Sequence, residues 1–519
     1  MAKEIPTWNV LELPLKSARR YDNPYVDVDV RVTFESPAGD RETAWGFWDG
    51  DDTWRVRFAP AVEGQWKWRS ESSDPDNGGL HGQTGEFHVS SHDGTNPICA
   101  HGFLAVSDNQ RGFVHQDGTP FFWLGDTAWS MSAGVTVEEW EEYLAFRRAQ
   151  GFNVVQVNSL PQHDSTVSDY RTPFATGGRG WDVARPNVVY FRYLDQLVGM
   201  TTDAGMFTAM VVLWFDYVPG TNLWWRIKRR AFFTPELAAS YGRYLAARYA
   251  AFGTIWIVTG DSDFETPESM AVYDAAARAI RRTDPYRALT TAHLNGGIYT
   301  PDALNEREWL DFHVFQSGHG PDSRKRALTC AEKDRAYRPV RPVLNAEPMY
   351  DGVHRVYTGG RMPDRETLRA VYWSSVLGGG NAGLTYGAHG VWSWDRPPLS
   401  PTWRDVLRYE SADDAVRLKR FFERLPWWEL EPAHRLLAAG DGGNRVVACT
   451  PEQTVVVAYM PQAGELALNL AAERGYAGEW FNPRTGESQP ARVSPGDGNV
   501  VVGSPPWQGD AVLLLQSGR

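Results

Sequence analysis

The segment "RPVLNAEPMY", residues 341–350, places polar residues directly where a short apolar run ends. The run "PVL" is followed by Asn345, Ala346 and Glu347. A short apolar run bounded by turn-forming residues is typical of a strand buried in a parallel sheet. Glu347 is then either an acid at the mouth of a pocket or a surface carboxylate in a turn, and the surrounding sequence has to distinguish the two.

Seven further runs of this kind lie between about residues 100 and 425. They are "FFWLGD" (121–126), "FNVVQVN" (152–158), "MFTAMVVLW" (206–214), "TIWIVTGD" (254–261), "RALTTAH" (287–293), "LDFHVFQ" (310–316) and "AGLTYG" (382–387). Amphipathic segments with helix signals separate them. Thr136 and Glu139 form a capping box before a segment that ends at Gly151, and Thr234 and Thr266 each precede a proline that can start a helix.

Eight alternations of strand and helix predict an α/β fold, a (β/α)8 TIM barrel over residues 93–430. A doubly wound sheet is the alternative. No glycine-rich phosphate loop follows any of these strands, which favours the barrel.

Both ends of the chain show short alternating strands instead. In "YVDVDVRVTF", residues 25–34, apolar residues alternate with polar ones, which predicts a half-buried strand. The runs "TWRVRFAP" and "GQWKWRS" repeat this alternation, and after about residue 430 the runs "TVVVAYM" and "AVLLLQ" are set apart by turn residues. We therefore predict an N-terminal Ig-like β-sandwich over residues 1–92 and a C-terminal β-sandwich over residues 431–519.

The composition narrows the class of partner. The 519 residues carry a net charge of −12, which argues against a nucleic-acid or anionic-membrane partner. The sequence shows no signal-peptide core and no apolar run of ~18 residues, so a cytoplasmic location is expected. Cys99, Cys330 and Cys449 are far apart, which supports neither a disulfide framework nor a zinc cluster. We expect no cofactor, and the sequence leaves open whether the chain forms a homo-oligomer.

Nearly every predicted barrel strand ends in a residue that can hydrogen-bond a polyol or stack on one. These residues are Asp126, Gln156, Asn158, Trp214, Asp261, His293, Gln316, Glu347 and Tyr386. In a (β/α)8 barrel the carboxyl ends of the strands converge on one mouth, so these side chains are expected to line one polar pocket.

Two acids in this set suggest a division of labour. Asp261 ends the fourth strand and Glu347 the seventh, so their carboxylates can flank a bound glycosidic bond across the barrel. Glycoside hydrolysis needs such a pair. We expect Glu347 to be the nucleophile and Asp261 the acid/base, with its proton retained by burial and by nearby negative charge. The alternative is that Asp261 caps the next segment and that Glu347 pairs with Arg341 or Arg355.

The central region resembles the apiosidase-like glycoside hydrolases of family 140 in the segments "FFWLGDTAW", "GFNVVQVN", "IWIVTGD", "PVLNAEPMYDG" and "YGAHGVWSW". The segments "WRVRFAPAVEGQWKW" and "EWFNPRTGE" resemble the β-sandwich modules that flank such barrels. The resemblance implies an acid/base at Asp261, a nucleophile at Glu347 and a retaining mechanism with carboxyl groups ~5–5.5 Å apart. One departure is Thr259, which stands where the family tends to have a second glycine before the aspartate.

The predicted substrate-binding residues are Asp126, Trp129, Gln156, Asn158, Trp214, His293, Gln316, His319, Tyr386 and Trp392. Amide side chains suit hydroxyl groups because they donate and accept at once, and tryptophans can form the floor of a sugar site. For Asp126 an N-cap role is an open alternative, and a single histidine is more often structural than functional.

These observations predict a retaining exo-glycoside hydrolase that releases a terminal pentofuranose, such as apiose or arabinofuranose, from an oligosaccharide or glycoside. A non-catalytic carbohydrate-binding protein on a barrel scaffold is the alternative. A metal-dependent hydrolase is not supported because no HxH or HExxH spacing occurs, so no metal site is expected.

Overall fold

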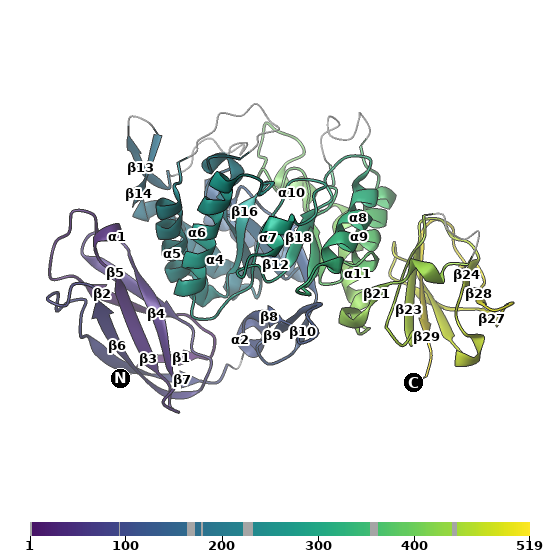
Figure 1. Ribbon diagram of the computed structural model, residues 1–519, viewed down its shortest axis with the longest axis horizontal. Coiled ribbons are helices and arrows are strands. Elements are labelled where there is room, and N and C mark those ends of the chain that lie inside the picture. The colour runs from purple at the N-terminus through teal and green to yellow at the C-terminus, as the bar shows by residue number, and fades with distance from the viewer. Residues whose placement is uncertain are drawn as a thin grey trace.

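The computed structural model describes residues 3–92, 94–162, 172–177, 180–221, 232–352, 362–438 and 444–518. A central barrel lies between an N-terminal and a C-terminal β-sheet region (Figure 1). Within these ranges, no helix combines the length and the hydrophobicity needed to cross a lipid bilayer.

Eight parallel strands form the centre of the molecule. They are β11 (Trp123–Thr127), β12 (Val154–Asn158), β15 (Phe207–Trp214), β16 (Ile255–Gly260), β17 (Thr290–Thr291), β18 (His313–Gln316), β19 (Val343–Glu347) and β20 (Gly383–Tyr386). Their order is β17-β16-β15-β12-β11-β20-β19-β18, so each strand lies beside its neighbours in the sequence. This order excludes the doubly wound alternative.

Backbone hydrogen bonds also connect the two ends of this sheet. The amide of Asp311 donates to the carbonyl of Thr290 at 2.9 Å, and that of Gly297 donates to Gln316 at 2.7 Å. The sheet is therefore a nearly closed barrel. Each of the eight predicted runs contains a strand, although β17 is much shorter than "RALTTAH" indicated.

Helices follow the barrel strands and cover the outside of the sheet (Figure 1). They are α3 (Val137–Gln150), α4 (Val188–Asp203), α5 (Pro235–Tyr249), α6 (Pro267–Thr283), α7 (Asp302–Asn305), α8 (Ser323–Ala336), α9 (Arg365–Leu377), α10 (Trp403–Val406) and α11 (Glu410–Phe422). The predicted helix starts are confirmed: Thr136 and Glu139 form both bonds of a capping box, and Thr234 and Thr266 cap α5 and α6. A hairpin of β13 (Phe174–Gly177) and β14 (Gly180–Pro186) is inserted before α4.

A small sheet closes the amino-terminal end of the barrel. It contains β8 (Leu104–Val106), β9 (Phe113–His115) and β10 (Pro120–Phe121) and follows helix α2 (Pro97–His101). The ring of Phe113 lies 5.0 Å from that of Phe312 and 6.0 Å from that of Trp123, next to the first residues of β18 and β11. The open mouth is therefore at the carboxyl ends of the strands.

The N-terminal region folds over a separate apolar core. Its strands are β1 (Lys3–Pro6), β2 (Leu11–Lys16), β3 (Val30–Glu35), β4 (Arg41–Trp48), β5 (Thr53–Phe58), β6 (Gly64–Ser72) and β7 (Thr84–Ser90). The long strand β4 pairs with β3 through residues 41–45 and with β5 through residues 46–48, so the sheet bends over on itself.

The strand predicted from residue 25 begins only at Val30. Pro24 instead opens the short helix α1 (Pro24–Asp27). This turn buries Tyr25 at 5.3 Å from the ring of Tyr244, whereas Val26 is 45% exposed. The alternation of valines predicted the buried face correctly from residue 28 onward but did not reveal the helical turn that begins at Pro24.

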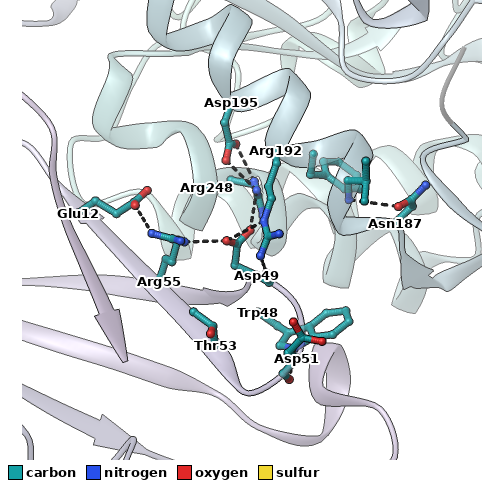
Figure 2. Close-up of polar contacts among 12 residues, drawn as sticks. Glu12, Trp48, Asp49, Asp51, Thr53, Arg55, Asn187, Arg192, Asp195 and Arg248 are labelled. Atoms are coloured by element: carbon teal, nitrogen blue, oxygen red, sulfur yellow. Dashed lines mark hydrogen bonds and ion pairs between the residues drawn. The ribbon is translucent and has the colours of Figure 1, made fainter. Parts of the chain in front are cut away.

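A buried cluster of charges attaches the N-terminal sheet to the barrel (Figure 2). Asp49, in the turn after β4, contacts Arg55 at 2.6 Å, Arg192 of α4 at 3.1 Å and Arg248 of α5 at 2.9 Å. Arg248 also binds Asp195 of α4 at 2.6 Å. Burial raises the pKa of Asp195, but the neighbouring guanidinium groups outweigh this effect and hold the pKa below its usual value. These contacts lock the sheet onto two helices of the barrel.

The C-terminal region contains two further sheets around a second core. Its strands are β21 (Glu431–Pro432), β22 (Val446–Cys449), β23 (Val455–Met460), β24 (Leu466–Leu468), β25 (Ala477–Phe481), β26 (Ser488–Ala491), β27 (Val493–Pro495), β28 (Val500–Val502) and β29 (Ala511–Gln516). Trp373 of α9 stacks on Tyr459 at 5.9 Å, and Arg369 binds Asp510 at 2.7 Å in a buried pair. Helix α9 of the barrel thus forms the main contact with the C-terminal region.

Replacing Asp49 with alanine should destabilise the fold strongly, because it leaves Arg55, Arg192 and Arg248 without their shared carboxylate. Because Arg248 keeps Asp195 and Arg55 keeps Glu12, we expect the free energy of unfolding to fall by about 1–3 kcal/mol, as for buried polar groups that lose one of their partners. Denaturant unfolding measures this change. Asp52→Ala is the matched control, since Asp52 lies in the same turn and pairs with Lys16 only on the exposed surface. Equal effects of the two substitutions would contradict this role for the cluster.

Candidate active site

Glu347 is the last residue of β19 and is only 5% exposed. His319 Nε2 lies 3.0 Å from its Oε1, and His293 Nε2 lies 3.2 Å from its Oε2. Burial alone would raise the pKa of Glu347. The two imidazoles outweigh this effect and hold the pKa of the carboxyl well below its usual range. Glu347 is therefore an anion at neutral pH although it is almost withdrawn from water.

Asp261 follows β16 directly and has a backbone φ of 48°, in the left-handed region. Residues other than glycine rarely adopt this conformation, and such residues cluster at functional sites. Gln316 Nε2 donates to its Oδ1 at 3.3 Å. The side chain is 18% exposed, so a bound molecule can reach it. The preceding residue, Gly260, is required because a Cβ there would lie 2.0 Å from the indole of Trp214.

The two acids meet at the mouth of the barrel. One atom each of Asp261, His293 and Glu347 lie within 4.8 Å of one another. His293 stands between the acids, with Nδ1 3.7 Å from Asp261 Oδ1. Burial would lower the pKa of His293, but the charge of Glu347, with a smaller contribution from Asp261, raises it above its usual value. The arrangement is an imidazole placed between two carboxyl groups, with the three side chains drawn from the ends of three barrel strands.

His319 has its tautomer set by its neighbour. The backbone amide of Tyr350 donates to His319 Nδ1 at 3.3 Å, so Nδ1 accepts a hydrogen bond and the proton of a neutral ring is on Nε2. Nε2 can then donate to Glu347. The ring of Tyr350 lies 4.3 Å from the imidazole, and its hydroxyl accepts a bond from Trp129 Nε1 at 2.8 Å.

Two buried tryptophans stand beside the acids. The ring of Trp129 lies 5.7 Å from that of Trp214 and 5.4 Å from that of His293. Trp214 lies 6.2 Å from His293 in a stacked orientation. Both indoles are almost fully buried and pack against the imidazole of His293. In the part of the chain that the structure describes, Trp214 Nε1 has no hydrogen-bond partner.

The structure brings together Trp129, Trp214, Asp261, His293, Gln316, His319 and Glu347. It places three other predicted residues in different contacts. Asp126 binds Arg147 of α3 at 2.6 Å and is completely buried. Gln156 donates to the carbonyl of Ala346 at 3.0 Å and accepts from a threonine of β20 inside the barrel. Tyr386 has its hydroxyl 3.2 Å from that of a serine of α11.

Asn158 ends β12 and Trp392 follows β20, and among the described residues neither hydrogen-bonds to Asp261 or Glu347. The amide nitrogen of Asn158 lies 3.4 Å from Gln162 Oε1. Trp392 is half-buried and donates from Nε1 to His389 at 3.0 Å. Binding of substrate by these two residues stays a prediction.

Two residues near the acids were not singled out from the sequence for a role in the site. Tyr350 lies in the segment after Glu347, and an aromatic residue following a strand end was the available signal. Thr259 donates from Oγ1 to the carbonyl of His293 at 2.8 Å and so holds the end of β17. It occupies the position at which the chain departs from the family pattern.

Arg341 and Arg355 were the alternative partners expected for Glu347. The guanidinium of Arg341 binds Asn305 at 2.7 Å and the carbonyl of Leu310 at 2.7 Å. Arg355 lies outside the described residues. The close contacts of the Glu347 carboxylate are therefore the two histidines rather than Arg341.

The nitrogen and oxygen atoms of Asp261, His293 and Glu347 also form a donor set that suits a divalent cation. The expectation of no metal site rested on the spacing of residues along the chain. That spacing does not reveal a cluster built from three separate strands.

The depressed pKa of Glu347 predicts a pH-dependent contribution to stability. A carboxylate whose pKa is lower folded than unfolded stabilises the fold above the unfolded value of ~4.3, and this contribution is lost as the pH falls through the folded value. The raised pKa of His293 acts with the opposite sign, because its cation stabilises the fold below ~6.5 and this is lost at higher pH. We expect wild type to lose more stability than Glu347→Gln between about pH 6 and pH 3.

Thermal melting of both proteins across this pH range measures the difference. Glu142→Gln is a suitable control, since Glu142 pairs with Arg404 on the exposed surface and should follow wild type. Parallel pH curves for wild type and Glu347→Gln would show that Glu347 is not stabilised as an anion.

Solved structures share this architecture. A "putative glycoside hydrolase" from Bacteroides vulgatus is 21% identical, with a TM-score of 0.78, over 99% of this chain and 100% of that chain. A glycoside hydrolase family 5 protein from the same organism is 24% identical, with a TM-score of 0.70, over 82% of this chain and 95% of its own. At this level of identity the likeness establishes the fold alone. No curated protein matches the sequence.

Three family models match successive parts of the chain. Residues 4–73 match a domain of unknown function, DUF5060, and residues 432–516 match the family described as "Putative collagen-binding domain of a collagenase". Residues 107–429, which contain the barrel and all the residues of the site, match the family described as "Apiosidase-like, catalytic domain". The chain therefore belongs to the apiosidase-like family of glycoside hydrolases.

Proposed function

We propose that this glycosidase is a retaining exo-acting enzyme on a (β/α)8 barrel that releases a terminal pentofuranose. The observation that carries the proposal is that oxygen atoms of Asp261 and Glu347 lie within 4.8 Å of each other. Retaining glycosidases hold their carboxyl groups ~5–5.5 Å apart, whereas inverting enzymes need ~6.5–9.5 Å to admit a water molecule. The short separation supports the retaining mechanism.

In the first step, a carboxylate oxygen of Glu347 attacks the anomeric carbon and the glycosidic C–O bond breaks. Asp261, as a carboxylic acid, gives its proton to the departing oxygen. The product is a glycosyl ester on Glu347 and a free alcohol. The site favours this direction of attack because Glu347 is anionic, and its negative charge stabilises the positive charge that develops on the sugar ring.

In the second step, water attacks the same carbon from the side that the alcohol has left. Asp261, now a carboxylate, takes a proton from the water, and the ester bond to Glu347 breaks. Two inversions at the anomeric carbon give overall retention. The exposed fraction of Asp261 supports this assignment, since the acid/base must reach both the leaving group and water.

His293 and His319 are proposed to position the nucleophile rather than to react. Each faces a different oxygen of Glu347, so together they fix the plane of its carboxylate. The family description supports the choice of sugar, because apiose is a pentose that forms furanose rings; arabinofuranose is the closest alternative. The three family matches support a catalytic domain at residues 93–430 between sandwich domains at 1–92 and 431–519.

Replacing either acid should lower turnover, and only for Asp261 should the loss depend on the leaving group. Asp261→Ala should lower kcat/KM about 10²–10⁴-fold on an unactivated apioside or arabinofuranoside and much less on a nitrophenyl glycoside, which needs no proton. Glu347→Ala should fail on both. Asp263→Ala is the matched control, since this neighbouring carboxylate bonds to Asn295 instead. NMR of the first released anomer tests retention.

The alternative of a non-catalytic carbohydrate-binding protein makes the opposite prediction. Wild type would bind a panel of furanosides and pyranosides without hydrolysing any of them. Turnover that survives in Glu347→Ala would also contradict the assignment of the nucleophile.

A metal-assisted hydrolase is a second candidate, favoured by the donor set of Asp261, His293 and Glu347. The two-carboxylate mechanism predicts that dialysis against EDTA leaves kcat/KM unchanged and that added Zn²⁺ inhibits by occupying the acids. Loss of activity with EDTA, together with its recovery on adding one equivalent of a divalent metal, would favour the metal-assisted reaction instead.

A further inference from the structure

An open pocket of about 410 Å³ lies between the N-terminal sheet and the β13–β14 hairpin. It shares no lining residue with the acids at the mouth of the barrel. Its size falls within the ~300–1,000 Å³ typical of pockets for small molecules. The accessible residues that matter for its chemistry are Asp22, Asn23, Trp48, Thr176 and Arg185.

Apolar side chains form part of this pocket. Trp48 is half-buried at the end of β4, and its indole N–H donates to the carbonyl of Asp51 at 3.1 Å, which fixes the plane of the ring. Pro24 is half-buried and extends the apolar surface, and the buried side chains of Phe174 and Pro186 pack beneath it. An aromatic ring with a fixed plane suits the C–H face of a sugar ring.

Polar groups with unused capacity line the rest of the pocket. Asn23 donates from Nδ2 to the carbonyl of Ala184 at 3.0 Å, which leaves its side-chain oxygen to accept. Among the described residues, Asp22 is exposed and has no ion pair, and the ion pair of Arg185 is with Asp182, at 3.4 Å on the surface. These planar side chains offer paired donors or acceptors that match neighbouring hydroxyls. One acid and one base cancel in charge, which favours a neutral ligand.

The walls of the pocket are held in place before any ligand binds. Trp48 is followed directly by Asp49, whose carboxylate binds Arg192 of α4 and Arg248 of α5. Asn187, another lining residue, caps the same helix α4. Figure 2 shows Trp48 and Asn187 beside this cluster. A pocket whose two sides are already locked together avoids the cost of ordering them on binding.

We propose that this pocket is a second carbohydrate-binding site, which holds a neutral glycan through Trp48 while the acids act elsewhere on the chain. The inference rests on the proposed function only in taking a carbohydrate as the ligand, and it is independent of which sugar is released.

Calorimetric titration of the full-length Glu347→Gln protein tests the site without turnover. The probes are xylohexaose and arabinohexaose as neutral chains and a hexagalacturonide as an acidic one. We expect saturable binding of a neutral chain that weakens at least tenfold when Trp48→Ala is added. Thr176→Trp is a second variant, since residue 176 is exposed and a large side chain there fills the pocket without removing a core contact. Trp68→Ala, in β6 of the same sheet, is the matched control and should bind as the parent does.

The proposal is overturned if neither neutral chain binds the parent, if the titration is unchanged by both Trp48→Ala and Thr176→Trp, or if only the acidic chain binds. Hydrolysis of nitrophenyl glycosides by wild type, measured separately, tests the proposed function. Binding that depends on Trp48 in a protein without hydrolysis would therefore reject the enzyme proposal and leave the second site standing.

Discussion

A carboxylate withdrawn from water and held between two imidazoles is the interaction on which the site depends. Burial by itself favours the protonated acid, but His293 and His319 each face one oxygen of Glu347 and reverse that preference. Each histidine is itself positioned by one hydrogen bond that involves the backbone. The amide of Tyr350 sets the tautomer of His319, and Thr259 holds the carbonyl of His293. A short chain of contacts thus prepares one side chain as a buried anion.

This arrangement is possible because neighbouring parallel strands end at one place. Strands β16, β17, β18 and β19 lie in sequence along the edge of the barrel and deliver Asp261, His293, Gln316 and Glu347 to its mouth. The small sheet of β8, β9 and β10, which contains Phe113, closes the opposite end of the barrel. The charge cluster at the N-terminal sheet and the contacts of α9 with the C-terminal sheets brace the outer helices. The site therefore rests on strand ends of a rigid scaffold, which resists small displacements of its side chains.

Much of the candidate site could be predicted from where apolar runs end, because a parallel sheet turns strand ends into neighbours. The prediction was weaker for the direction in which each side chain points. Asp126 is the penultimate residue of β11, whereas Glu347 is the last residue of β19, and Asp126 binds a buried arginine of α3 instead of facing the two acids. The side-chain amide of Gln156 likewise forms hydrogen bonds to neighbouring strands inside the barrel. Successive side chains of a strand point to opposite faces of the sheet. An error of one residue in the predicted strand end therefore assigns to the pocket a side chain that packs against other elements.

The sequence by itself determined the eight barrel strands, the capped helix starts and the two strand-rich ends, because hydrophobic periodicity and capping act over a few residues. It also placed Asp261 and Glu347 at strand ends that meet at one mouth of the barrel. Only the tertiary structure decided that His293 stands between them, that Asp261 takes a left-handed backbone conformation and that Asp49 joins the N-terminal sheet to two helices. Each of these depends on partners distant in the chain, and the hydrogen bonds and charges that select them exist only once the strands have come together.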